Sequence, residues 1–142
     1  MSEDCIFCRI VAGDIPGRVV YETDDVLAFL DANPLAAGHT LVIPKAHHER
    51  VGDMPGDVAA AVGEALSVVA PAVEAAVDAP GTTIAYNNGE AAGQEVPHAH
   101  AHIVPRHEGD GTGPIHGMFA DRPSLDDGEL DDIAESIGAR VS

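Results

Sequence analysis

Short apolar runs alternate with polar turns over much of the chain. Residues 26–31 and 39–44 each have the length and composition of a strand, and residues 18–21 form a shorter run before an acidic turn. Residues 82–87 and 98–105 have the same character farther along the chain. This pattern predicts about five strands, with residues 39–44 as a central strand that is covered on both faces.

A helical period governs residues 56–78. Apolar residues recur there three or four positions apart, at Val58, Val62, Leu66, Val69 and Val73. The spacing predicts a long helix with one apolar stripe. Pro71 should kink or split this helix, because proline has no N–H to donate to the helical ladder.

A second helix is expected near the end of the chain. Residues 124–127 resemble a capping box, and Leu130, Ile133 and Ile137 fit one face of a short closing helix. Strands grouped around two main helices predict an α+β fold with an antiparallel sheet, and not a doubly wound parallel one.

Length and composition suit a single domain. The chain has 142 residues, of which 45 % are apolar, so a core of ordinary size can form. No uninterrupted apolar run approaches the ~20 residues of a membrane span. The acidic start, Met1 to Asp4, is not followed by an apolar signal region. We therefore expect a cytoplasmic protein that does not enter a membrane.

The charge is strongly negative. Acidic residues number 24 against 7 basic ones, which gives a net charge of -17, and Lys45 is the single lysine. Such a surface repels nucleic acids and anionic membranes, so neither is an expected partner. The loss of lysine favours a halophilic protein, since molar salt shortens the Debye length to ~3 Å and screens self-repulsion.

Three histidines alternate in the last predicted strand. His98, His100 and His102 should project from one face, because side chains alternate across a strand. Three imidazoles could hold a zinc ion. One imidazole could instead attack phosphorus, since a ring with a pKa of about 6.5 is largely neutral near pH 7, while a protonated neighbour serves the leaving group. The spacing alone leaves both chemistries open.

The two cysteines, Cys5 and Cys8, are too few for a disulfide framework, and thiols stay reduced in the cytoplasm. They are metal ligands, a redox pair or packing residues.

Four segments carry a resemblance to a known family. They are Cys-Ile-Phe-Cys-Arg-Ile at 5–10, Gly-His-Thr-Leu-Val-Ile-Pro-Lys at 38–45, Ala-Gly-Gln at 92–94 and His-Ala-His-Ala-His at 98–102. Together they resemble the histidine-triad (HIT) superfamily of nucleotide hydrolases and transferases, and its Hint-like branch most closely. The resemblance covers residues 4–106, the expected HIT domain. Residues 107–142 are expected to form an acidic extension, with a short helix, that packs on the same domain. The family also implies a homodimer that joins two sheets into one.

The resemblance assigns roles to four histidines. His100 would attack the α-phosphorus and form a nucleotidyl-histidine intermediate, which water then hydrolyses. His102 would contact the phosphate and aid proton transfer to the leaving group. His98 would orient His100 through its backbone carbonyl, and His39 would lie beside the phosphate.

Binding positions carry over in the same way. Asp31 would hold the ribose hydroxyls, since a carboxylate can accept both protons of a cis-diol. Five further residues are implied to bind substrate. An apolar slot for the base would be formed by Ile6, Phe7 and Leu41, and polar contacts near the phosphate would come from Asn87 and Gln94. Glu95 departs from the family, which often has Ser or Thr there. A carboxylate beside phosphate is unfavourable, so we hypothesise that it favours a cationic leaving group.

Some relatives carry a zinc site that this chain could reproduce. Cys5 and Cys8 would be joined by His47 and His98, with His48 as a competing ligand next door. Four protein ligands leave no open position for water, so this zinc would be structural. No organic cofactor is expected. The expected activity is hydrolysis of adenosine phosphoramidate-type nucleotides. The alternatives are a dinucleoside polyphosphate hydrolase, a nucleotidyltransferase, or a nucleotide-binding module with incidental hydrolysis.

Overall fold

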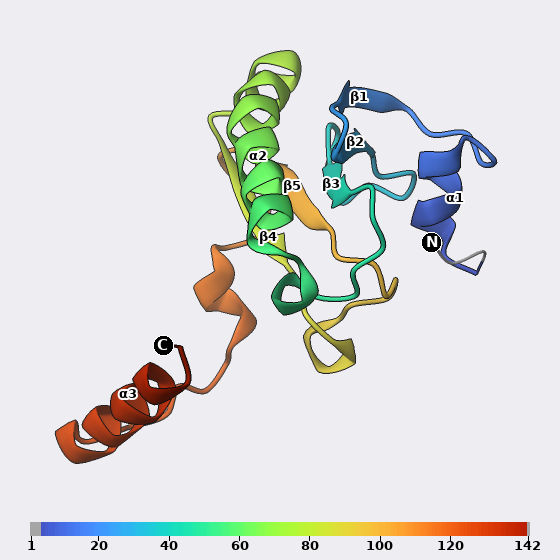
Figure 1. Cartoon of the computed structure of the whole chain (residues 1–142). Coiled ribbons are helices and arrows are strands. Elements are labelled where there is room, and N and C mark those ends of the chain that lie inside the picture. Colours follow the sequence, from blue (N-terminus) through green and yellow to red (C-terminus); the bar gives the residue numbers. More distant parts are fainter. Residues whose placement is uncertain (1–3, 142) are drawn as a thin grey trace. The chain divides into compact units, whose positions relative to one another are not determined.

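One antiparallel sheet forms the centre of the computed structural model, which describes residues 4–141 (Figure 1). Its strands follow the order β1-β2-β3-β5-β4, and every neighbouring pair is antiparallel. The strands are β1 (Val19–Glu22), β2 (Val26–Leu30), β3 (Thr40–Pro44), β4 (Gly81–Tyr86) and β5 (Ala101–Arg106), and the helices are α1 (Ile6–Ala12), α2 (Gly56–Val77) and α3 (Asp127–Val141). The predicted α+β class and five-stranded antiparallel sheet are confirmed.

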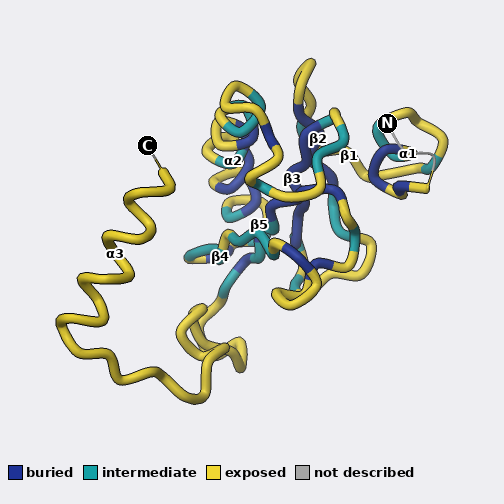
Figure 2. The backbone as a smooth tube through the Cα atoms, turned by 60° about the horizontal axis from the view of Figure 1, so that its bottom comes forward, coloured by how far each residue is buried: buried dark blue, intermediate teal, exposed yellow. Residues whose placement is uncertain are grey.

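The two faces of the sheet pack against different partners. Paired residues Ala28, Val42 and Ala101 lie on the face that packs against α2. The next row, Phe29, Leu41 and His102, points the opposite way, where Phe29 and Leu41 pack with α1. Figure 2 shows the burial concentrated in the middle strands and the adjacent side of α2. The small apolar residues between the histidines therefore anchor the histidine segment on one face, and the histidines are presented on the other.

Helix α2 covers one face of the sheet with the predicted stripe. Val62, Val69 and Val73 are buried, and Val58 and Leu66 are partly buried against the same core. The helix runs unbroken through Pro71, so the predicted split is wrong. Proline removes the donor to the carbonyl four residues earlier, but Ser67 is exposed and water can satisfy it.

Helix α2 is long and apolar enough to cross a membrane, judged by length and composition only. It is the one helix among residues 4–141 that meets this criterion. Acidic residues interrupt its sequence at Asp57, Glu64 and Glu74, so it does not stand out as an uninterrupted apolar run. The contacts of α2 with β2, β3, β4 and β5 account for its apolar character as a core helix.

The last strand begins later than predicted. β5 starts at Ala101, so His98 and His100 precede it and only His102 lies within it. Ala99 N–H donates to the carbonyl of His48 (2.6 Å), and the ring of His98 bonds the carbonyl of Pro44 (2.8 Å). The predicted strand over residues 98–105 is therefore wrong at its start, because residues 98 and 99 bond the end of β3 and the loop behind it instead of the ladder.

The chain divides after Asp110 into two compact units. The second unit holds α3, whose apolar residues Leu130, Ile133 and Ile137 are exposed. A capping box starts this helix, but at Asp126 and Glu129, whose side chains bond each other's backbone N–H (2.8 and 3.3 Å). The box predicted at residues 124–127 is two residues early, because the longer Glu129 side chain reaches back better than that of Asp127. The packing of this extension on the first unit stays a prediction.

Candidate functional site

The three histidines of the triad divide into a pair and a single ring. The rings of His100 and His102 are neighbours, with centroids 4.9 Å apart. The ring of His98 is fully buried and turns toward the cysteines of α1 and toward His47. The described residues contain two groups suited to a metal, and neither contains all three triad imidazoles. The zinc cage considered from spacing alone is therefore not formed.

The orientation of His100 is fixed by the backbone. Its Nδ1 lies 2.7 Å from the carbonyl oxygen of His98, the contact that the family resemblance implies. A carbonyl only accepts, so Nδ1 must carry the proton, and Nε2 of a neutral His100 keeps its lone pair. Phe7 packs edge-on against the same ring at 5.0 Å between centroids. The residue is only 8 % exposed, so the ring is mostly shielded from water.

His102 is supported from behind by His39. His39 Nε2 and His102 Nδ1 are 2.9 Å apart, and Leu35 N–H donates to His39 Nδ1 at 3.0 Å. Asp31 Oδ2 lies 3.7 Å from the same His39 nitrogen. Asp31, His39 and His102 form the second group suited to a metal, but the facing nitrogens of the two rings are already bonded to each other.

Burial keeps these rings neutral. The pKa of His102 is lowered to about 4, first by desolvation and then by the neighbouring charges of His100 and His39. The pKa of His39 is also lowered by burial, against the attraction of Asp31. Neutral rings offer one donor and one acceptor each, so the hydrogen-bond partners decide which nitrogen carries the proton.

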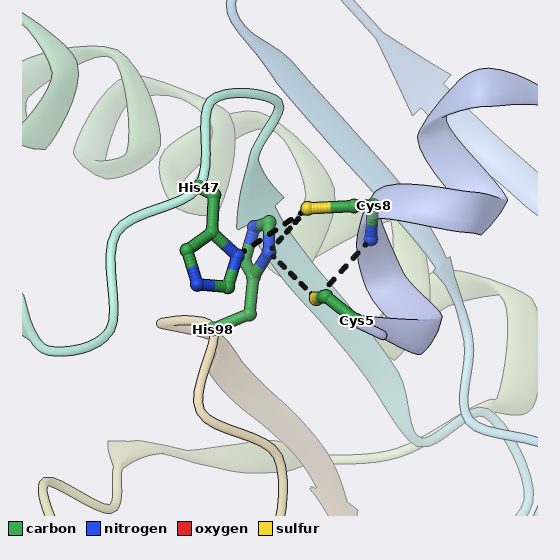
Figure 3. A group of neighbouring side chains, drawn as sticks. All are labelled: Cys5, Cys8, His47 and His98. Carbon is green, nitrogen blue, oxygen red and sulfur yellow. Dashed lines mark hydrogen bonds between the residues drawn. The ribbon is translucent and has the colours of Figure 1, made fainter. Parts of the chain in front are cut away.

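The other group contains the four residues implied as zinc ligands: Cys5, Cys8, His47 and His98 (Figure 3). Helix α1, which the sequence pattern did not predict, presents both thiols on one turn. Cys5 is its N-cap, and its sulfur accepts from Cys8 N–H at 3.4 Å.

The donor set of this group fits a tetrahedral metal. His98 Nε2 bonds the carbonyl of Pro44, so its proton lies there and its Nδ1 lone pair faces Cys5 Sγ (3.3 Å) and Cys8 Sγ (3.5 Å). His47 Nδ1 lies 3.3 Å from Cys8 Sγ. Burial lowers the pKa of His98 to about 4 and raises that of Cys5. Two thiols and two imidazoles within 4.8 Å of one another suit zinc, which would displace the thiol protons. His48 is not in the group.

The positions implied to bind the base are unequally placed. Phe7 and Leu41 are buried in one apolar cluster, while Ile6 is 47 % exposed. Asp31 and Asn87 are half-buried, and Asp31 also accepts from Asn33 N–H at 2.9 Å.

Gln94 is engaged with the backbone on both ends of its amide. Its oxygen accepts from Gly89 N–H (2.7 Å), and its nitrogen donates to the carbonyls of Glu49 (2.7 Å) and Val96 (3.0 Å). Both amide protons are used, so the geometry gives Gln94 the task of holding the segment that leads into His98. The sequence held no signal for this, since Glu49 is 45 residues away.

Comparison with known proteins agrees with this geometry. The model of the HIT domain matches residues 12–109. Protein hit of Bacillus subtilis is 44 % identical over 99 % of this chain and 97 % of its own length. An adenylylsulfatase of Arabidopsis thaliana, HINT3, is 40 % identical over 78 % of this chain, which spans 56 % of that protein.

Solved structures match as well. The crystal structure of a HIT family member from Bacillus subtilis superposes with a TM-score of 0.88 at 41 % identity, covering 99 % of both chains. A zinc-bound histidine triad family protein from Mycobacterium smegmatis superposes with a TM-score of 0.73 at 35 % identity, covering 96 % of this chain and 98 % of that one.

The low pKa of His102 makes stability depend on pH. In the unfolded chain the ring takes up a proton near pH 6.5, but in the folded chain only near pH 4. The free energy of unfolding of the metal-free protein should therefore decrease as the pH falls through this window, by at most about 1.4 kcal/mol per pH unit from this group and less where water reaches it. Urea denaturation of wild type and His102→Gln across the window checks this, and the variant should lack that part of the slope. Equal slopes in the two proteins would contradict the assignment.

Proposed function

Because this chain belongs to the histidine-triad (HIT) family, we propose that it hydrolyses nucleotides at the α-phosphate with His100 Nε2 as the nucleophile. One observation carries the proposal. The hydrogen bond from His100 Nδ1–H to the carbonyl of His98 leaves the lone pair on Nε2, in a ring that lies directly beside His102. An unprotonated nitrogen with a neighbouring donor is the arrangement that in-line attack on phosphorus requires.

In the proposed first step, His100 Nε2 forms a bond to the α-phosphorus while the bond to the leaving group breaks. The negative phosphate raises the pKa of the adjacent His102, so that this ring is protonated in the complex. Its Nε2 proton goes to the leaving group, which departs with the electron pair.

The second step returns both rings to their state in the substrate complex, and His102 gives back the proton taken up on binding when the product leaves. Water bonds to phosphorus and gives one proton to His102 Nε2. The bond between phosphorus and His100 breaks, and the nucleoside monophosphate is released. One water is consumed in each cycle, and no proton is left over.

The substrate class proposed is an adenylyl nucleotide with an amine leaving group. Its support is the family and the relative named adenylylsulfatase, whose name specifies an adenylyl compound. Asp31 would hold the ribose, and Ile6, Phe7 and Leu41 would lie along the base. Asn87 would contact the phosphate region, with Gln94 holding the neighbouring segment. A dinucleoside polyphosphate hydrolase is the alternative, and a nucleotide-binding module with incidental hydrolysis is the rival without a catalytic role.

Zinc is proposed at Cys5, Cys8, His47 and His98. The zinc-bound relative from Mycobacterium smegmatis and the four converging donor atoms support it. When bound, the metal would supply a rigid structural link between α1 and the segment that holds His100, with no open position for water. His98 would contribute Nδ1 to the metal while its carbonyl still accepts from His100.

The proposed setting combines the family and the charge. We propose a cytoplasmic protein that forms the homodimer implied by the family, and that is adapted to high salt, since a net charge of -17 needs screening before a nucleotide can approach. The same charge disfavours nucleic acids and anionic membranes as partners.

The covalent intermediate is the first test. Wild type mixed with adenosine 5′-phosphoramidate should carry an adenylyl group on His100, seen by mass spectrometry of protein denatured at neutral pH. His100→Ala should lack the adduct and lose at least ~1,000-fold in kcat, because the nucleophile is gone. His116→Ala, which makes the same change at an exposed histidine, is the control. Tight nucleotide binding with no adduct in wild type would favour the binding module.

Metal content tests the zinc site. Untagged protein purified without chelator should hold about one zinc per chain, and Cys8→Ser should hold less than ~0.2, since three ligands bind a structural ion weakly. His48→Ala should keep its zinc, because His48 lies outside the group. A wild-type content below ~0.2 would remove zinc from the proposal.

Glu95 tests the leaving-group preference. This carboxylate is exposed and lines a cavity of about 390 Å³ together with Glu49, Glu90 and Arg50. Glu95→Ser should shift the ratio of kcat/KM about tenfold away from a phosphoramidate with a cationic amine and toward a dinucleoside polyphosphate. Glu64→Ser removes the same charge from the exposed side of α2 and should leave the ratio unchanged. An unaltered ratio in Glu95→Ser would refute the preference.

A further inference from the structure

The loop from Asp31 to His39 is folded around the ring of His39. Asp31 N–H donates to the carbonyl of His39 (2.9 Å), and His39 N–H donates to the carbonyl of Ala36 (3.0 Å). Inside this closed loop, the backbone N–H of Leu35 points at His39 Nδ1 (3.0 Å). The ring is only 2 % exposed. His39 therefore has little surface left with which to touch a substrate.

Hydrogen bonds fix the proton positions along this chain. A backbone N–H can only donate, so Nδ1 of His39 must accept, and the proton of the neutral ring lies on Nε2. This proton points at His102 Nδ1, 2.9 Å away, which must accept in turn. The proton of neutral His102 is thereby placed on its Nε2, the nitrogen not occupied by His39.

We propose that His39 is a positioning residue, which acts through His102 by holding that neutral ring in the Nε2–H tautomer before substrate binds, so that Nε2 already carries the proton that the leaving group takes. The inference rests on the proposed function and changes the role that the family resemblance gave to His39, which was a place beside the phosphate. The tautomer is set by the backbone N–H of Leu35. No substitution of Leu35 other than proline removes this N–H.

The same loop also serves the charged state of the pair. When His102 gains a proton, its Nδ1–H needs an acceptor, so His39 Nε2 must present a lone pair. This requires the proton of His39 to lie on Nδ1, where it replaces the contact from the Leu35 N–H and has Asp31 Oδ2, 3.7 Å away, as its acceptor. His100 opposes this charge and Asp31 favours it. His39 Nε2 thus donates to His102 Nδ1 when both rings are neutral, and accepts from it when His102 is protonated.

The tautomer itself can be measured in the wild-type protein. Two-bond ¹H–¹⁵N spectra of ¹⁵N-histidine-labelled protein at pH 7.5 should show His102 with its proton on Nε2, with the assignment taken from the spectrum of His102→Gln. A proton on Nδ1 of His102 would overturn the proposal. This measurement needs no His39 variant, so it holds even where such a variant does not fold.

Kinetics on two substrates separate positioning from general structural support. An amine leaving group needs a proton, whereas p-nitrophenolate does not. His39→Leu should lose ~100-fold in kcat on adenosine 5′-phosphoramidate and less than ~3-fold on the p-nitrophenyl ester of AMP, with KM nearly unchanged on both. His39→Gln keeps an N–H that can donate to His102 Nδ1 and should recover at least ~10-fold of the loss. Equal losses on both substrates, or no recovery by Gln, would overturn the proposal.

The control is His107→Leu, which makes the same change at an exposed histidine and should leave both rates unaltered. Failure of the proposed function is seen separately. If wild type forms no adduct on His100, the hydrolase proposal fails whatever the tautomer of His102. If the adduct forms but His39→Leu slows both substrates alike, only the role of His39 is lost.

Discussion

The structure depends on how the buried residue His98 is bonded. Its ring donates from Nε2 to the carbonyl of Pro44 at the end of β3, and this single bond decides which nitrogen faces the two thiols. Its own carbonyl accepts from His100 Nδ1–H and so decides where the lone pair of a neutral His100, the proposed nucleophile, lies. If the ring of His98 took the other tautomer, its proton would face the sulfurs and the buried hydrogen bond to the Pro44 carbonyl would be lost, which costs about 1–3 kcal/mol. One residue therefore connects the candidate metal group, the central strand and the ring of His100.

Backbone groups set the proton positions of the other rings in the same way. A carbonyl fixes His100 from one side, and the Leu35 N–H fixes His39, and through it His102. Main-chain groups cannot change their donor or acceptor character, whereas a side-chain partner such as a carboxylate changes with pH. Because the surrounding strands are buried, these partners are also held in place. The sheet thus contributes directly to the chemistry, beyond the support of a binding surface.

Periodicity predicted the parts of this arrangement that local sequence controls. The alternation of histidine with alanine correctly indicated a packed face, since Ala99 and Ala101 are buried toward α2. It failed at His98, because the strand ladder starts only at Ala101 and His98 bonds Pro44, a partner 54 residues away. Helix α1 was missed because seven residues give little helical period, and its cap is a cysteine, whose sulfur is a weak acceptor. The cysteine and histidine ligand set was available only through the resemblance, since its members are up to 93 residues apart.

The acidity of the chain and the neutrality of its buried histidines have the same consequence: the site carries little positive charge before a ligand binds. A protein with a net charge of -17 offers a nucleotide no general attraction, and the buried rings add no positive charge before the ligand arrives, since burial holds the pKa of His102 near 4. An anionic phosphate beside that ring reverses the balance by making the charged form favourable. Proton uptake and nucleotide binding are then linked, so that each favours the other. In the proposed mechanism, the positive charge needed for leaving-group departure would arise only where a phosphate is present, and Asp31 and His39 are placed to share it.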